Sequence, residues 1–261
     1  MAAPESNNKF PPDSLNPAAE PLLARIRDNV IGERTPLATP FGEKPLIYAD
    51  YTASGRGLNF IEDSIRHQVL PWYANTHTET SATGRQTTAF REQARATIRQ
   101  SVNAGEEHAV IFCGAGATAA INRLLDSLGL RKENYERFGA DVSEIPHEQR
   151  PVVFIGPFEH HSNDLPWRES IADVVTIPQD GDGGVNLEEL QRALERYADR
   201  PLKIGSFSAA SNVTGIRTDV EAVTRVLQQN GALSFWDYAA AAPYVNIDMR
   251  GPGGSKDAIF I

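Results

Sequence analysis

The sequence of residues 204–237 is IGSFSAASNVTGIRTDVEAVTRVLQQNGALSFWD. It starts and ends with short apolar runs, 204–208 and 232–236, that are typical of buried strands. Between these runs, apolar side chains recur at the spacing of one helix face: Val220, Val223 and Leu227. A strand, a helix and a second strand in this order predict a parallel βαβ unit.

The same alternation continues on both sides of this unit. Further strands are expected at 46–50, 109–113, 152–155, 174–177 and 258–261. Further helices are expected at 22–31, 87–104, 117–128 and 187–197. Asn186 is the expected N-cap of the last of these, and Thr218-x-x-Glu221 predicts a capping box for the helix that follows it.

Strands that alternate with helices predict an α/β fold, and here a three-layer α/β/α arrangement around a mainly parallel sheet. An α/β barrel is the weaker alternative, because the segment before Ala109 lacks the repeating unit. The connection over 130–151 is long and polar, so we expect it to run over the surface.

The composition excludes several classes of protein. The chain has 261 residues, with 25 Lys and Arg against 34 Asp and Glu and a net charge of −9, which disfavours binding to nucleic acids. A single cysteine, Cys113, excludes an intramolecular disulfide and a cysteine-rich zinc site. No apolar stretch approaches the length of a membrane span, about 18 residues. Residues 1–20 are rich in Pro, Asn, Ala and Ser without an apolar signal core, which predicts a flexible arm and a cytoplasmic protein.

Polar groups follow four of the expected strands. They are Gly114–Thr118, Glu159–Asn163, Ser211–Gly215 and Asp237. Ligands of open parallel sheets bind beyond the carboxyl ends of the strands, so we expect these groups to meet in one site.

Each group suits one part of a ligand, although each also has a simpler structural interpretation. The glycine-rich turn before a helix suits a phosphate, with the Thr118 hydroxyl as a further donor, but it is also an ordinary tight turn. Asp237, behind a buried strand, suits a protonated ring nitrogen, or it caps the next helix. His160 can stack on an aromatic ring, and Asn212 can donate to a ring oxygen or simply form a turn. A phosphate and such a ring together describe pyridoxal phosphate.

The chain resembles the class V aminotransferases, the fold-type I pyridoxal-phosphate group that includes cysteine desulfurases and kynureninase. The motifs that carry the resemblance occur in the family's order over residues 45–261. They are YADYTA (48–53), NTH (75–77), GATAAIN (116–122), EHHSN (159–163), SNVTG (211–215) and DYA (237–239). The resemblance implies that residues 21–261 form the large pyridoxal-phosphate-binding domain, incomplete and without the C-terminal small domain. It also implies an amino-acid substrate and a homodimer.

The resemblance implies a role for each site residue. Ala117 and Thr118 would hold the cofactor phosphate, and His160 would stack on the ring. Asn212 would contact the ring's phenolic oxygen, and Asp237 would keep the ring nitrogen protonated. Asn75 and His77 would line the substrate side of the site. Catalytic roles would fall to His160 and Asp237.

Several features depart from the family pattern. Many desulfurases have Gln where this chain has Ala240, and Arg-Gly where it has Thr78-Glu79. The family's Schiff-base lysine, in a Ser-x-His-Lys sequence after a strand like 257–261, is not in this chain. Lys203 and Lys256 precede their strands, so we expect both at the opposite edge of the sheet. The chain is therefore expected to be a fragment, inactive as supplied.

Three other functions remain as alternatives. The first is a catalytically dead binding or scaffold protein with the same fold. The second is an NAD(P)-binding oxidoreductase, because Gly114-x-Gly116-x-x-Ala119 fits the dinucleotide fingerprint, but the strand that should carry the acidic partner comes nearly 40 residues on and lacks it. The third is a metal site at 159–161, which is disfavoured because adjacent histidines rarely converge on one ion without a distant ligand.

Overall fold

The computed structural model of the chain describes residues 20–137, 139 and 141–261, and the predicted arm at 1–20 lies, apart from Glu20, outside them. The chain divides into two compact units, one up to Ala89 and one from Phe90 to Ile261. That residues 21–261 form one cofactor-binding domain stays a prediction.

The first unit contains helices and one small hairpin. In chain order it holds α1 (Glu20–Asn29), β1 (Pro36–Thr39), β2 (Gly42–Pro45), α2 (Asn59–Ser64), a π-helical turn (Ile65–Val69), a 3-10 turn (Leu70–Trp72) and the start of α3 (Ala82–Ser101). The strand expected at 46–50 is wrong, because the antiparallel pairing of β1 and β2 ends at Pro45. The Tyr48 hydroxyl instead donates to the carbonyls of Asp50 and Ser54, which holds the segment in a turn.

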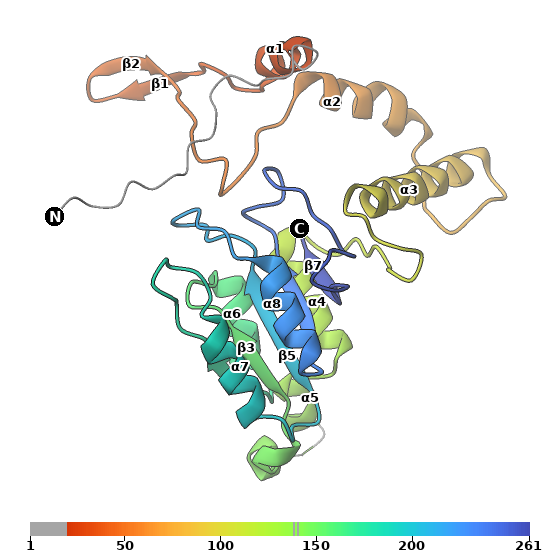
Figure 1. The fold of residues 1–261 in the computed structure, drawn as a ribbon. Helices are drawn as coiled ribbons and strands as arrows, with labels where there is room; N and C mark the ends of the chain where they lie inside the picture. The colour runs from red at the N-terminus through yellow and green to blue at the C-terminus, as the bar shows by residue number, and fades with distance from the viewer. Residues whose placement is uncertain (1–19, 138, 140) are drawn as a thin grey trace. The chain divides into compact units, whose positions relative to one another are not determined.

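The second unit is built on a five-stranded parallel sheet with the strand order β4-β3-β5-β6-β7. Figure 1 labels β3, β5 and β7 of this sheet. The strands are β3 (Val152–Ile155), β4 (Asp173–Thr176), β5 (Lys203–Ser208), β6 (Leu233–Asp237) and β7 (Ala258–Phe260). All five were expected, to within a residue or two at their ends. The sheet is open, with β4 and β7 as its edges, so the barrel alternative is wrong.

The strand expected at 109–113 does not form. Ile111 and Phe112, which a buried strand would cover, are 65% and 50% exposed. An apolar run becomes a strand only when a neighbour takes up its backbone hydrogen bonds, and no described strand pairs with this segment. The prediction was wrong because it rested on the side-chain pattern alone. That pattern does not show whether a neighbouring strand is present to accept and donate the backbone hydrogen bonds.

Helices cover both faces of the sheet, which confirms the three-layer fold (Figure 1). They are α4 (Gly116–Ser127), α5 (Lys132–Glu136), α6 (His161–Arg168), α7 (Leu187–Arg196) and α8 (Val220–Gln229). Because successive strand residues point to opposite faces, Val152 and Phe154 pack with α7 and α8, whereas Val153 and Ile155 pack with α4 and α6. No helix in the described ranges is long and apolar enough to cross a membrane.

Two predicted helix caps had different outcomes. Asn186 caps α7 by accepting from the N–H of Glu189, as expected. The capping box at Thr218 is wrong, because the cap of α8 is Asp219, which accepts from the N–H of Ala222 at 3.0 Å. The Thr218 hydroxyl donates instead to the Ser208 carbonyl at 2.7 Å, which joins the start of the helix to the end of β5.

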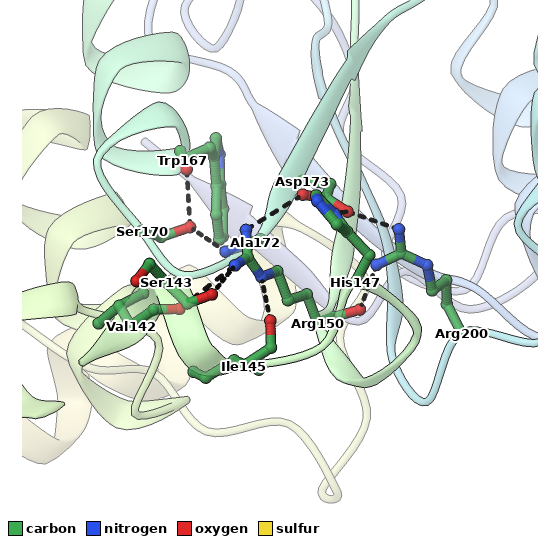
Figure 2. Close-up of polar contacts among 10 residues, drawn as sticks. All are labelled: Val142, Ser143, Ile145, His147, Arg150, Trp167, Ser170, Ala172, Asp173 and Arg200. Atoms are coloured by element: carbon green, nitrogen blue, oxygen red, sulfur yellow. Dashed lines mark hydrogen bonds and ion pairs between the residues drawn. The ribbon is translucent and has the colours of Figure 1, made fainter. Parts of the chain in front are cut away.

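The excursion over 130–151 is held to the amino edge of the sheet by polar contacts (Figure 2). The Arg150 guanidinium donates to the carbonyl of Ile145 at 2.9 Å. Arg200 donates to the Arg150 carbonyl at 2.8 Å and forms an ion pair with Asp173, which His147 also approaches. These contacts fasten the end of the excursion to the starts of β3, β4 and β5. The predicted site lies at the opposite, carboxyl ends of the strands.

Replacing Asp173 with asparagine is expected to lower the free energy of unfolding at pH 7 by about 1 kcal/mol, because it leaves the half-buried Arg200 without its counter-ion. Burial alone would raise the pKa of Asp173, but hydrogen bonds from Arg200 and His147 hold it below its usual value. Its stabilising effect should therefore be present above about pH 4 and be lost as the pH falls further. Urea unfolding measures the difference, and the exposed Asp182→Asn is the control; equal stability of the two variants would contradict the assignment.

Candidate active site

The candidate site lies at the carboxyl ends of β3, β5 and β6. β4, the next strand in the chain, pairs with one side of β3, and β5 pairs with the other side. The order of strands across the sheet therefore reverses at β3. Such a reversal separates the loops that follow neighbouring strands and leaves room for a ligand between them. The residues that follow β3 and β5 therefore lie at the natural binding position of this fold.

Asp237 is the last residue of β6 and is only 4% exposed. Within the described part of the chain, the one hydrogen bond to its carboxylate comes from the N–H of Ala239, 2.9 Å from Oδ1. Burial raises the pKa of Asp237, whereas the Ala239 N–H and a positive charge on His160 lower it. A buried carboxylate with so little compensation favours a cationic or N–H donating ligand group.

His160 stands at the N-cap of α6, directly beyond β3. Its Nδ1 accepts from the N–H of Ser162 at 3.2 Å and lies 2.8 Å from the Ser162 hydroxyl. The network therefore assigns the proton of the neutral ring to Nε2. The ring is exposed and lies within electrostatic reach of Asp237, so the structure brings these two predicted residues together.

Glu159 is a member of the site whose contacts the sequence did not reveal. Its Oε1 accepts from the N–H groups of Ser208 at 2.9 Å and Gly156 at 3.2 Å. Its Oε2 accepts from the Ser208 hydroxyl at 2.6 Å and the Asn163 amide at 2.7 Å. Burial raises the pKa of Glu159 to about 7 against the effect of these hydrogen bonds, and the charge of Asp237 adds to the rise. The usable signal was a carboxylate shortly after a buried strand, the same signal that singled out Asp237.

The predicted phosphate turn precedes α4. Gly114 and Gly116 have φ values of +54° and +71°, which glycine adopts readily. Ala115 is the N-cap and makes no side-chain hydrogen bond to the helix, so the first-turn N–H groups have no side-chain cap. Ala117 is buried and Thr118 is exposed in that turn. An uncapped helix N-terminus of this kind suits an anion.

Asn212 lies in the turn that follows β5. The Ser211 hydroxyl accepts from the N–H groups of Val213 and Thr214, both at 3.2 Å, and Gly215 closes the turn with a φ of +71°. Asn212 itself is exposed. The hydrogen bonds within the turn hold its backbone without help from the Asn212 side chain, which is therefore available to a ligand.

Asn75 and His77 lie in the first unit, in the loop between the Leu70–Trp72 turn and α3. His77 has a φ of +72°, in the left-handed region that non-glycine residues rarely adopt. Their place on the substrate side stays a prediction.

Lys203 and Lys256 come before β5 and β7 in the chain, and each has a local partner for its ammonium group. Lys203 is the first residue of β5, and its ammonium donates to the Ala198 carbonyl at 3.1 Å. Lys256 is 1% exposed and pairs with Glu221 of α8 at 2.8 Å. Both ammonium groups are held by these local partners.

Two alternative sites find no support in the structure. The dinucleotide fingerprint requires a strand directly before Gly114, and residues 109–113 form none. Among the described residues, no group of three or more His, Cys, Asp or Glu is arranged to hold a metal ion.

Solved structures share this fold. A cysteine desulfurase from Thermococcus onnurineus in its apo form superposes with a TM-score of 0.62 at 21% identity, covering 78% of this chain and 46% of that one. A NifS-like protein from Rickettsia africae superposes with a TM-score of 0.63 at 18% identity, covering 82% of this chain and 54% of that one. At these identities the likeness shows the fold alone.

Curated relatives add a likeness in sequence. A probable cysteine desulfurase from Halalkalibacterium halodurans is 26% identical over 210 residues, which cover 79% of this chain and 47% of that protein. One from Staphylococcus aureus is 30% identical over 215 residues, covering 79% of this chain and 46% of that protein. The chain thus spans about half the length of the curated relatives it matches. The family model described as Aminotransferase class-V matches residues 47–253. The chain belongs to the aminotransferase class-V family.

Proposed function

We propose that this chain binds pyridoxal phosphate at the carboxyl edge of its sheet and serves a cysteine-desulfurase-like reaction on an amino acid. The observation that carries the proposal is Asp237, a carboxylate that is 4% exposed and has a raised pKa. Such a group fits a protonated pyridine nitrogen, because the ring N–H would supply the compensation that the protein does not. The uncapped start of α4 fits the phosphate in the same way.

The chain's own residues would divide the work of binding. Asp237 would hold the ring nitrogen's proton, and the His160 ring would cover one face of the cofactor. The N–H groups of Ala117 and Thr118, with the Thr118 hydroxyl, would bind the phosphate, and Asn212 would donate to the ring oxygen. Asn75 and His77 would lie on the substrate side. When bound, the group supplies an electron sink for negative charge that develops on an amino-acid carbon.

We further propose that these 261 residues hold the cofactor noncovalently and do not turn over substrate alone. The lysines of the second unit are Lys132 on α5, and Lys203 and Lys256, whose ammonium groups are held by Ala198 and Glu221. None of the three follows a strand at the carboxyl edge where Asp237 lies. A cytoplasmic homodimer is the setting that we propose from the family resemblance.

The alternative is a catalytically dead binding or scaffold protein with the same fold. Such a protein would have the same fold and the same site residues. It would stay inactive even when the catalytic groups that this chain lacks are supplied. Adding the matching half of a relative in trans separates the two, because only the enzyme precursor should gain activity toward cysteine.

The binding mode can be tested by dialysis followed by borohydride reduction and mass spectrometry. We expect a dissociation constant between roughly 10 μM and 1 mM, about −7 to −4 kcal/mol, and full release of the cofactor on dialysis. Reduction should leave no pyridoxyl group on Lys203 or Lys256, because both ammonium groups are held by local partners. A stable adduct on either lysine would overturn the placement of the site.

A further inference from the structure

We propose that Glu159 is a positioning residue, which together with Asn163 fixes the backbone of His160 against the end of β5 and thereby sets the orientation of the His160 ring. The inference deepens the proposed function and rests on it for the role of His160, but the geometry that carries it belongs to the protein alone.

Glu159 fastens the loop after β3 to the end of β5. Both of its carboxylate oxygens accept from Ser208, one from the N–H at 2.9 Å and the other from the hydroxyl at 2.6 Å. Ser208 is the last residue of β5 and lies opposite Asp237 in the register of the sheet. The residue directly before His160 is therefore held at the strand end that adjoins the strand carrying Asp237.

Asn163 fastens the other side of His160. Its N–H donates to the His160 carbonyl at 2.8 Å, and its side-chain amide donates to Glu159 at 2.7 Å. The Asn163 side chain is 0% exposed, and its Oδ1 accepts from the Ser206 hydroxyl at 2.6 Å and the Trp167 indole at 3.3 Å. The His160 peptide thus lies between two residues that are bonded to each other and to β5.

A purely structural role explains this network less well. Burial raises the pKa of Glu159 to about 7, so its carboxylate is costly to ionise where it lies. The charged groups that act on this part of the site are Asp237, which opposes ionisation of Glu159, and His160, which favours ionisation of Asp237. Glu159 holds the residue before His160 to Ser208, and Ser208 lies opposite Asp237, so the network joins the two residues proposed to contact the ring.

The test compares Glu159→Ala, Glu159→Gln and the control Glu148→Gln, an exposed glutamate of the 130–151 excursion. The first readout is the side-chain ¹⁵N spectrum of the histidines in the ligand-free chain, with His160 assigned through His160→Gln. The second is the circular dichroism that added pyridoxal phosphate acquires on binding, per bound molecule. Free pyridoxal phosphate is achiral, so this signal reports a fixed ring.

We expect Glu159→Ala to shift or broaden the His160 signals and to lose at least half of the induced dichroism, with about fivefold weaker binding. Glu159→Gln should restore most of both signals, because its amide oxygen can still accept from Ser208 and Gly156. Glu148→Gln should match the unmodified chain. Unchanged His160 signals in Glu159→Ala, with an unchanged far-ultraviolet spectrum, would overturn the proposal.

Failure of the proposed function gives a different result. If the unmodified chain binds no pyridoxal phosphate, the proposed function fails, while the His160 signals still decide whether Glu159 positions that ring. If Glu159→Ala does not fold, Ser208→Ala carries the test, because it removes the hydroxyl that donates to Oε2 of Glu159. Unchanged His160 signals in a folded Ser208→Ala variant would then overturn the proposal.

Discussion

Replacing Asp237 with alanine is expected to weaken the binding of pyridoxal phosphate about 10- to 100-fold. A hydrogen bond between charged groups contributes about 1.5–3 kcal/mol, and 1.4 kcal/mol is a factor of ten in affinity. Asp237 should reach this range because it is buried and has one protein donor, Ala239, within the described chain. Equilibrium dialysis at pH 8 measures the change directly.

Two further variants separate this effect from loss of the fold. Asp237→Asn keeps the volume and removes the charge, so it should lose most of the affinity and gain stability at pH 8, where the raised pKa makes the ionised carboxylate unfavourable. Cys113→Ala should retain most of the affinity, because it removes a half-buried thiol and no charge. The assignment of Asp237 would be refuted by a Cys113→Ala variant that loses more affinity than Asp237→Ala.

The second large effect is a dependence of stability on pH that Glu159 imposes. Its pKa rises from an ordinary 4.5 to about 7, so the folded chain binds this proton more tightly than the unfolded chain does. The free energy of unfolding should therefore fall as the pH rises from about 4.5 to about 7, and level off above it. At 1.4 kcal/mol per pH unit, the fall is at most about 3 kcal/mol.

Urea unfolding of the unmodified chain and of Glu159→Gln at pH 5, 6, 7 and 8 measures this contribution. Glutamine cannot ionise, so the difference between the two curves isolates Glu159 from the other titrating groups, Asp237 and the histidines among them. We expect the difference to change in favour of Glu159→Gln by about 2–3 kcal/mol between pH 5 and pH 8. Parallel curves would show that Glu159 has an ordinary pKa and that its surroundings are more hydrated than the structure implies.

The sequence predicted those parts of the fold that follow from side-chain pattern. Residues 152–155 and 204–208 are apolar runs that became strands, and the order of strands and helices was enough to predict the three layers. Residues 109–113 have the same pattern and formed no strand, because a strand also needs a neighbour for its N–H and C=O groups. The pattern of one segment carries no information about that neighbour.

The candidate site was predictable to a similar extent. Asp237 stood out because a carboxylate directly after a buried strand needs a partner that offsets the cost of burying its charge. The contacts of Glu159 could not be predicted, because its main partner, Ser208, lies 49 residues further along the chain and meets it only once β3 and β5 pair. Position along a strand can be inferred from the sequence, whereas hydrogen bonds between loops depend on the register of the sheet.

We propose that the edge of the sheet beside Asp237 binds pyridoxal phosphate by its protonated ring nitrogen. The most direct test is an NMR spectrum of pyridoxal phosphate labelled with ¹⁵N in the ring, added to the unmodified chain at pH 8. We expect a bound signal at the position of a protonated pyridine, and its loss in Asp237→Ala. A bound signal at the position of neutral pyridine, or no bound signal at millimolar protein, would contradict it.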